Sequence, residues 1–177
     1  MPDQLKLHMT KRQLIFTYVY YSVIFVIGNC LSLFSITPIT FLSIPFGFLE
    51  LGIIGGIGMS CLGSSIYYIR KLYKSCINGA IVLDSTEAGF LNRLGTVTYY
   101  LARPFFSVGF SILIVVGLLS GFMAVSIKDI ELKQGFVYVI MFCSFFTGFL
   151  AGRFVKILET EGVGFLKRLR PEFGGRQ

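Results

Sequence analysis

The chain has 177 residues, of which 54% are hydrophobic and only 14% are charged. Soluble domains carry about 25% charged residues, so this composition excludes a conventional soluble domain. Between Arg12 and Arg70 the only charged residue is Glu50, and about 20 apolar residues suffice for one crossing of a bilayer. The sequence therefore predicts an all-α membrane protein that forms a single membrane domain over residues 1–177.

The net charge of +7 is compatible with two explanations. Basic patches are typical of nucleic-acid-binding proteins, but basic residues also flank membrane spans on the cytoplasmic side. We favour the second explanation and expect no direct nucleic-acid binding by this chain. The cysteines form no CxxC pair, so they predict neither a disulfide framework nor a zinc site. They are Cys30, Cys61, Cys76 and Cys143.

Four apolar segments are predicted to cross the membrane as helices. The predicted spans are residues 14–36, 45–69, 104–127 and 135–152. Pro38 lies in the turn after the first span, where it disfavours a continuing helix. Pro45 and Pro104 suit the first turns of the second and third spans. The backbone N–H groups of a first turn have no partner within the helix, so proline, which has no N–H, loses no hydrogen bond there.

The distribution of basic residues predicts the orientation of these spans. Of the 16 Lys and Arg residues, only Lys128 and Lys133 fall outside the N-terminal tail, the central segment 70–103 and the tail 153–177. Because cytoplasmic loops carry the excess of Lys and Arg, we expect both termini and the central segment to be cytoplasmic.

The central segment contains a predicted amphipathic helix. Asp84 and Ser85 resemble a helix cap, and the apolar residues that follow recur at spacings of four, three and four, which places them on one face. These residues are Phe90, Leu94, Val97 and Leu101. The pattern leaves two surfaces open for this face: the membrane interface and a neighbouring subunit or partner.

The C-terminal tail is predicted to extend the fourth helix to about Glu161. Gly162 and Gly164 are expected to end that helix, before a basic piece in which Phe165, Leu166 and Leu169 are interleaved. Such a segment fits a membrane surface or a docking site; a charged tail that only fixes topology is the alternative.

Glu50 and Asn29 are the polar residues of interest within the first two spans. At 1.5 Å per residue, Glu50 is expected about 8 Å and Asn29 about 10 Å from the outer ends of their helices. A charged side chain inside a span faces protein, water or a partner. Three arrangements stay open: Glu50 pairs with Asn29, several copies of Glu50 ring an outer vestibule, or Glu50 lies at the headgroup interface.

Glycine pairs at GxxxG spacing occur in three of the four spans. They are Gly52 and Gly56, Gly117 and Gly121, and Gly148 and Gly152. In a bilayer, small residues let helix backbones approach closely. The pairs therefore predict tight helix packing, within one protomer or between protomers.

The residues that catalysis or metal binding would need are scarce. His8 is the only histidine and precedes the first span. The spans therefore contain no histidine on which a metal cluster or a catalytic triad could be built. The sequence contains no GxSxG, HExxH or P-loop motif. We expect neither an enzyme nor a cofactor.

The whole chain resembles the small four-span membrane subunit of the bacterial Kiwa anti-phage defence system. The segments that carry the resemblance are "KRQLIF", "ITPITFLSIPFG", "YYIRKLYKSC" and "GRFVKILETEG". The resemblance implies a homo-oligomer, tetrameric in form, in the bacterial inner membrane. It also implies that the protein senses phage attack there and that its partner is a cytosolic DNA-binding subunit.

Two functional hypotheses follow. The first is a membrane sensor or scaffold that recruits a cytosolic partner through aromatic residues and arginines, which are common interface anchors. The candidate docking residues are Tyr73, Phe90, Arg93, Phe165, Arg168 and Arg170. The alternative is an oligomeric channel or small transporter with Glu50 in an outer vestibule.

Overall fold

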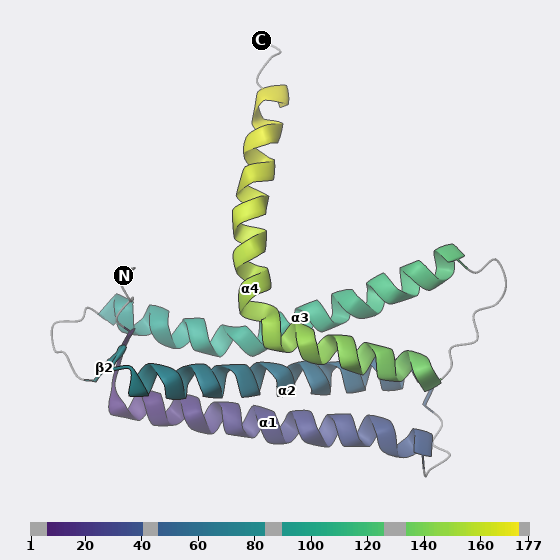
Figure 1. Cartoon of the computed structure of the whole chain (residues 1–177), viewed down its shortest axis with the longest axis horizontal. Coiled ribbons are helices and arrows are strands. Elements are labelled where there is room, and N and C mark those ends of the chain that lie inside the picture. Colours follow the sequence, from purple (N-terminus) through teal and green to yellow (C-terminus); the bar gives the residue numbers. More distant parts are fainter. Residues whose placement is uncertain (1–6, 41–45, 84–89, 126–133, 174–177) are drawn as a thin grey trace.

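The computed structural model describes residues 7–40, 46–83, 90–125 and 134–173 (Figure 1). Side chains are described for residues 9–37, 46–81, 94–121, 134–153 and 155. These ranges contain four long helices: α1 (Lys11–Thr40), α2 (Phe48–Ile77), α3 (Phe90–Val125) and α4 (Gln134–Phe173). Each contains a segment that is long and apolar enough to cross a membrane: Lys11–Thr37, Phe48–Ile77, Leu94–Gly121 and Gln134–Arg153. By length and composition, the expectation of four membrane-spanning helices is confirmed.

Helix α2 is the central helix of the bundle. It packs against α1, α3 and α4, and all of these lie along one long axis except the C-terminal part of α4 (Figure 1). Half of the most apolar window of α2 is buried, against 22% for α1 and for α3. The outer faces of α1 and α3 are therefore available to lipid or to other chains.

Local contacts set the ends of two helices. At the start of α1, the Thr10 hydroxyl accepts the Gln13 N–H at 3.3 Å, and the Gln13 side chain accepts the Thr10 N–H at 2.9 Å. This reciprocal pair is a capping box. Helix α2 ends just before Gly79, whose φ of 64° suits glycine, while the Ala80 N–H donates to the Ser75 carbonyl at 3.0 Å.

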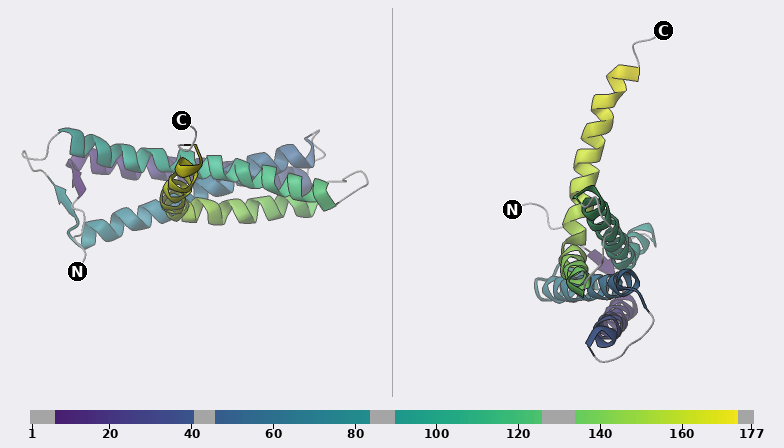
Figure 2. Two further views of the ribbon diagram at one scale, coloured as in Figure 1. Left: turned by 90° about the horizontal axis from the view of Figure 1, so that it is seen from above. Right: turned by 90° about the vertical axis from the view of Figure 1, so that its right-hand side faces the viewer.

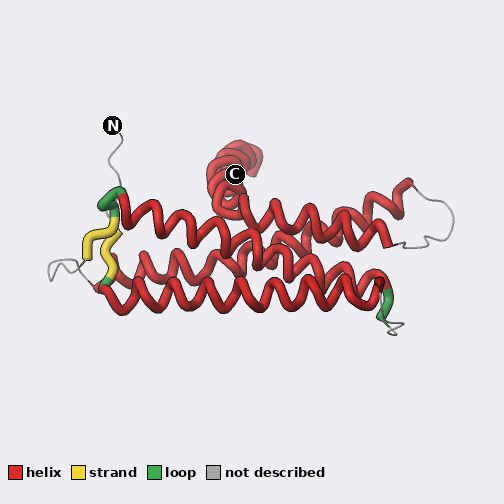
Figure 3. The backbone as a smooth tube through the Cα atoms, turned by 60° about the horizontal axis from the view of Figure 1, so that its bottom comes forward, coloured by secondary structure: helices red, strands yellow, loops and turns green. Residues whose placement is uncertain are grey.

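A pair of short parallel strands joins the N-terminus to the segment after α2. Strand β1 (Leu7–Met9) pairs with β2 (Ile81–Leu83) in the register Leu7 to Ile81 and Met9 to Leu83. The pair lies at one end of the bundle, beside the N-terminus of α1 (Figure 3). These strands were not predicted from the sequence, because three residues each are too few to show a periodicity.

The helices pack through small residues. The Ser35 hydroxyl donates to the Leu51 carbonyl at 2.5 Å across α1 and α2. Between α3 and α4, the hydroxyls of Ser111 and Ser144 are 2.8 Å apart and buried. A bilayer supplies no hydrophobic driving force for the association of helices. Hydrogen bonds from hydroxyl groups, together with close packing, hold such helices together instead.

The central segment differs from the expected separate amphipathic helix. Helix α2 continues to Ile77, and α3 is one 36-residue helix that contains Pro104 in its interior rather than at its start. The region after Phe90 is therefore continuous with the third span. The expected cap at Asp84 and Ser85 lies outside the described residues. Likewise, α1 runs through Pro38 to Thr40.

The expected break in the tail is also absent from the structure. Helix α4 continues through Gly162 and Gly164 to Phe173. Its direction changes instead: the C-terminal part turns away from the bundle and projects from its side (Figures 1 and 2). Two glycines weaken a helix by about 1 kcal/mol each relative to alanine, which does not force it to end.

Candidate functional site

Tyrosines gather at the end of the bundle that carries the strand pair. Eight of the nine tyrosines belong to this group, which we call the tyrosine band. Its members are Tyr18, Tyr20, Tyr21, Tyr67, Tyr68, Tyr73, Tyr99 and Tyr100. Tyr21, Tyr68 and Tyr100 are fully buried and form one cluster with Met9 and Leu72. Tyrosine is enriched where a membrane protein crosses the membrane–water interface, so we expect the exposed members of the band to lie near such a level.

Helix lengths measured from the tyrosine band match one bilayer. About 20 residues separate Tyr18 from Thr37 in α1, and the same number separate Tyr67 from Phe48 in α2. About 20 residues of helix are about 30 Å long, which is the thickness of the hydrocarbon core. In α4, Gly152 lies beside the Tyr68 hydroxyl of the band, and the helix turns away from the bundle in its middle part (Figure 1).

Two hydroxyls of the tyrosine band support the backbone next to Pro104. Proline has no N–H and its ring displaces the carbonyl four residues earlier, which here belongs to Tyr100. The Tyr21 hydroxyl donates to that carbonyl at 2.5 Å, and the Tyr20 hydroxyl donates to the Leu101 carbonyl at 3.1 Å. The Tyr21 hydroxyl of α1 thus replaces the one donor that Pro104 lacks, and the Tyr20 hydroxyl adds a bond to the next carbonyl of α3.

Arg103 is a buried cation within the third span. Its side chain is 8% exposed, and its guanidinium lies 4.2 Å from the centroid of the Tyr99 ring. Lys71 approaches the same ring: its Nζ is 5.1 Å from the centroid and donates to the Tyr99 hydroxyl at 3.0 Å. Cations over an aromatic face are attracted by the ring quadrupole. Tyr99 therefore holds two positive charges at the edge of the bundle.

Gly152 lies where α4 meets this group. A Cβ at Gly152 would be 2.8 Å from the Tyr68 hydroxyl and 3.8 Å from Nη1 of Arg103. Both polar atoms are buried, and neither has a hydrogen-bond partner within the described part of the chain. Glycine at this position lets α4 approach the two groups before it leaves the bundle.

Glu50 and Asn29 each form hydrogen bonds within their own helices. The Glu50 carboxylate is exposed and accepts the Gly47 N–H at 3.2 Å, at the first turn of α2. Asn29 donates to the Phe25 carbonyl at 2.9 Å. The single chain therefore does not contain the pairing of Glu50 with Asn29 that was one of three arrangements considered. Glu50 instead caps the helix, as an acidic residue does favourably at an N-terminus.

The candidate packing glycines have different surroundings. A Cβ on Gly52 or Gly56 would lie 2.9 Å from the Ile140 side chain. A Cβ on Gly148 would overlap the Ser60 carbonyl, which shows that α2 and α4 approach closely there. Gly117 and Gly121, by contrast, face open space within the described part of this chain. They pack against no described helix of the same protomer.

The candidate docking residues lie on three elements. Tyr73, near the end of α2, is 60% exposed. Phe90 and Arg93 are in the first turn of α3, while Phe165, Arg168 and Arg170 lie on the part of α4 that leaves the bundle. The side chains of these last five residues are outside the described ones, so their positions are known only along the helices.

The tyrosine band and the burial of Arg103 were not predicted from the sequence. The signal for the band was available, because the tyrosines occur in three short groups beside the basic ends of the predicted spans. Arg103 was counted only as a cytoplasmic charge. Among the residues that the structure describes, no three His, Cys, Asp or Glu side chains gather as a metal site.

No protein-family model, curated protein or solved structure matches this chain.

Proposed function

We propose that this protein is an oligomeric membrane sensor or scaffold that recruits a cytosolic partner, as the resemblance to the Kiwa membrane subunit implies. The observation that carries the proposal is the course of α4. This helix leaves the bundle beyond the part where Gly152 meets Tyr68 of the tyrosine band, and it continues as a helix to Phe173 (Figure 2). A helix held outside the bundle offers a surface for a partner that the membrane-embedded helices do not.

The charge distribution supports a cytoplasmic location for this helix. Lys11, Arg12, Arg70 and Lys74 are exposed on the parts of α1 and α2 that carry the tyrosine band. An excess of Lys and Arg marks the cytoplasmic side of a membrane protein. We therefore propose that both termini face the cytoplasm and that the membrane is a bacterial inner membrane.

The outer face of α3 supports self-association. Gly117 and Gly121 have open space beside them, and the neighbouring Leu113 and Val116 are 63% and 54% exposed. Paired small residues on an unoccupied helix face favour contact with another membrane helix. This face is our proposed contact between protomers, in a tetramer as the resemblance implies.

Deletion of residues 162–177 tests the recruitment proposal. The protein is purified from membranes of its native host, or of a host that also expresses neighbouring genes, and co-purifying proteins are identified by mass spectrometry. We expect the full chain to retain a cytosolic partner, while the shortened chain inserts normally and loses it. Exchange of Phe165 for Ala is expected to weaken the partner in the same way.

Two results would contradict the proposal. If the full chain retains no cytosolic protein and its deletion does not reduce protection against phage, the sensor or scaffold function is wrong. If the shortened chain retains the partner fully, the docking surface lies in residues 70–103 and the docking role of α4 is wrong.

A further inference from the structure

An apolar groove runs between α1 and α2 on the outside of the bundle. It has a volume of about 500 Å³ and is lined by Tyr18, Phe25, Ile66, Ile69, Arg70 and Tyr73. This volume lies within the range of small-ligand pockets, roughly 300–1,000 Å³. Phe25 and Ile66 are 38% and 40% exposed, so the groove is open to whatever surrounds the helices.

The groove changes character along its length. Phe25, Ile66 and Ile69 form its apolar part. Arg70, Tyr73 and Tyr18 lie at the other end, and Tyr73 is about seven residues, or about 10 Å, beyond Ile66 along α2. Arg70 is exposed, and Glu50, the only carboxylate among the described side chains, lies in the first turn of α2, far along the helix from it. One end therefore suits a hydrocarbon chain and the other a negative charge.

The level of the groove in the bilayer matches this polarity. Tyr18 and Tyr73 belong to the tyrosine band and are expected near the membrane–water interface. Phe25 and Ile66 lie on the hydrocarbon side of the band. The basic end of the groove is therefore at the depth of lipid headgroups, and its apolar end is at the depth of acyl chains.

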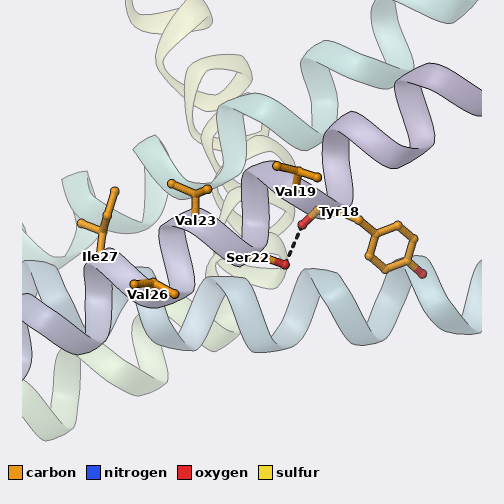
Figure 4. A pocket seen from close by; sticks show the side chains of 6 residues that line it. All are labelled: Tyr18, Val19, Ser22, Val23, Val26 and Ile27. Carbon is orange, nitrogen blue, oxygen red and sulfur yellow. Dashed lines mark hydrogen bonds between the residues drawn. The ribbon is translucent and has the colours of Figure 1, made fainter.

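A second apolar hollow adjoins the groove. Its volume is about 430 Å³, and it lies along α1, where Tyr18 lines both spaces (Figure 4). The other residues that line it are Val19, Ser22, Val23, Val26 and Ile27. The Ser22 hydroxyl donates to the Tyr18 carbonyl at 2.9 Å, so this polar group is satisfied within the helix. A lipid with two acyl chains has room for one chain in each space.

We propose that this groove is a binding site for an anionic phospholipid. The phosphate binds Arg70 and the Tyr73 hydroxyl, and one acyl chain lies along Phe25, Ile66 and Ile69. The second acyl chain occupies the hollow beyond Tyr18. Opposite charge, the apolar lining and the depth in the bilayer all select this occupant over a soluble ligand.

The test compares lipid retention between two variants of α2, Arg70→Gln and Lys74→Gln. The detergent-solubilised full chain is mixed with phosphatidylglycerol or phosphatidylcholine of identical acyl chains, and bound lipid is counted by native mass spectrometry. We expect the unaltered protein to retain phosphatidylglycerol preferentially. Arg70→Gln is expected to reduce that retention about fivefold, the factor for one basic residue at an anionic surface.

Lys74→Gln is the matched control. Lys74 is exposed on the same helix and carries the same charge, but it does not line the groove. We expect it to change phosphatidylglycerol retention less than twofold. Equal losses for Arg70→Gln and Lys74→Gln would show that only the general positive charge attracts lipid, and the proposed site would be wrong.

A second pair of variants tests the apolar end without changing charge. Ile66→Trp fills the groove and is expected to abolish preferential retention, while Val139→Trp, on an exposed face of α4, is expected to preserve it. Both positions are exposed, so folding is monitored by gel filtration. Unchanged retention in Ile66→Trp would overturn the proposal. So would cross-linking of Tyr73→Cys between two copies, because a second protomer would then occupy the groove.

The assay contains no protein partner, so its outcome is independent of whether the chain recruits a cytosolic protein.

Discussion

The hydroxyl of Tyr21 donates to the carbonyl of Tyr100 at 2.5 Å, and this carbonyl is the one that Pro104 cannot engage. The contact joins α1 to α3 over 79 residues of sequence. It explains how a proline is accommodated within a 36-residue helix, and it gives the tyrosine band a structural role in supporting α3.

Replacement of Tyr21 by Phe is expected to destabilise the protein by about 1–3 kcal/mol, because a buried carbonyl then lacks its donor. In a Pro104→Ala background the backbone N–H of residue 104 becomes available, so Tyr21→Phe is expected to have little effect. The free energies of unfolding in mixed micelles measure this cycle. Equal losses in both backgrounds would show that the hydroxyl does not replace the missing N–H.

Arg103 and Tyr99 are expected to be coupled energetically. A double-mutant cycle with Arg103→Met and Tyr99→Leu should give an interaction free energy of about 0.5–2 kcal/mol. Tyr99→Phe keeps the ring and should preserve most of this coupling, while it removes the hydrogen bond from Lys71. The unfolding free energies of the single and double variants measure it. A coupling that disappears in Tyr99→Phe would assign the interaction to the hydroxyl rather than to the ring.

Gly148 and Gly117 are expected to respond oppositely to alanine. A methyl group at Gly148 would overlap the Ser60 carbonyl, so we expect Gly148→Ala to destabilise the protein by about 1–3 kcal/mol through overpacking. Gly117 faces open space in the single chain. There, alanine should leave the stability unchanged or raise it by up to about 1 kcal/mol, which the free energy of unfolding in mixed micelles measures. Equal losses at both positions would contradict the packing described for α2 and α4.

The proposed contact between protomers is tested at the same face with a larger side chain. Gly121→Leu should lower the oligomer mass measured by native mass spectrometry, because leucine prevents the close approach of two backbones. The unfolding free energy of the protomer should stay close to that of the unaltered chain. An unchanged oligomer mass would place the contact between protomers elsewhere.

Glu50 is expected to act as a helix cap. Glutamine also accepts a hydrogen bond at this position, so Glu50→Gln should change the unfolding free energy little, while Glu50→Ala should reduce it by about 0.5–2 kcal/mol. Ion flux through liposomes separates this role from the channel hypothesis. A flux above background that falls in Glu50→Gln would favour a vestibule lined by Glu50.

The sequence alone determined the four spans. A bilayer offers no hydrogen bonds to the backbone, so long apolar segments must form helices. Hydropathy placed the starts of the first and last spans at residues 14 and 135, close to the starts of α1 and α4 at Lys11 and Gln134. It misplaced the start of the third span, since α3 begins well before Pro104, and it ended the second span at residue 69, whereas α2 continues to Ile77. The capping role of Glu50 was not predicted: the sequence placed this residue about 8 Å inside the second span, whereas its carboxylate accepts the Gly47 N–H at the first turn of α2. The clustering of basic residues predicts that both termini and the central segment are cytoplasmic, and this orientation stays a prediction.

Only the tertiary structure decided how helices continue and which side chains meet. Pro104 indicated a helix start, but hydroxyls from α1 support the adjacent backbone, and a sequence pattern within α3 contains no sign of these distant donors. Gly52 and Gly117 occur in the same spacing motif, yet one contacts Ile140 and the other faces open space. The burial of Arg103 was likewise decided by the tertiary structure. Its neighbours Tyr99, Tyr68 and Gly152 come from three helices, and only the packing of these helices sets how they are rotated relative to one another.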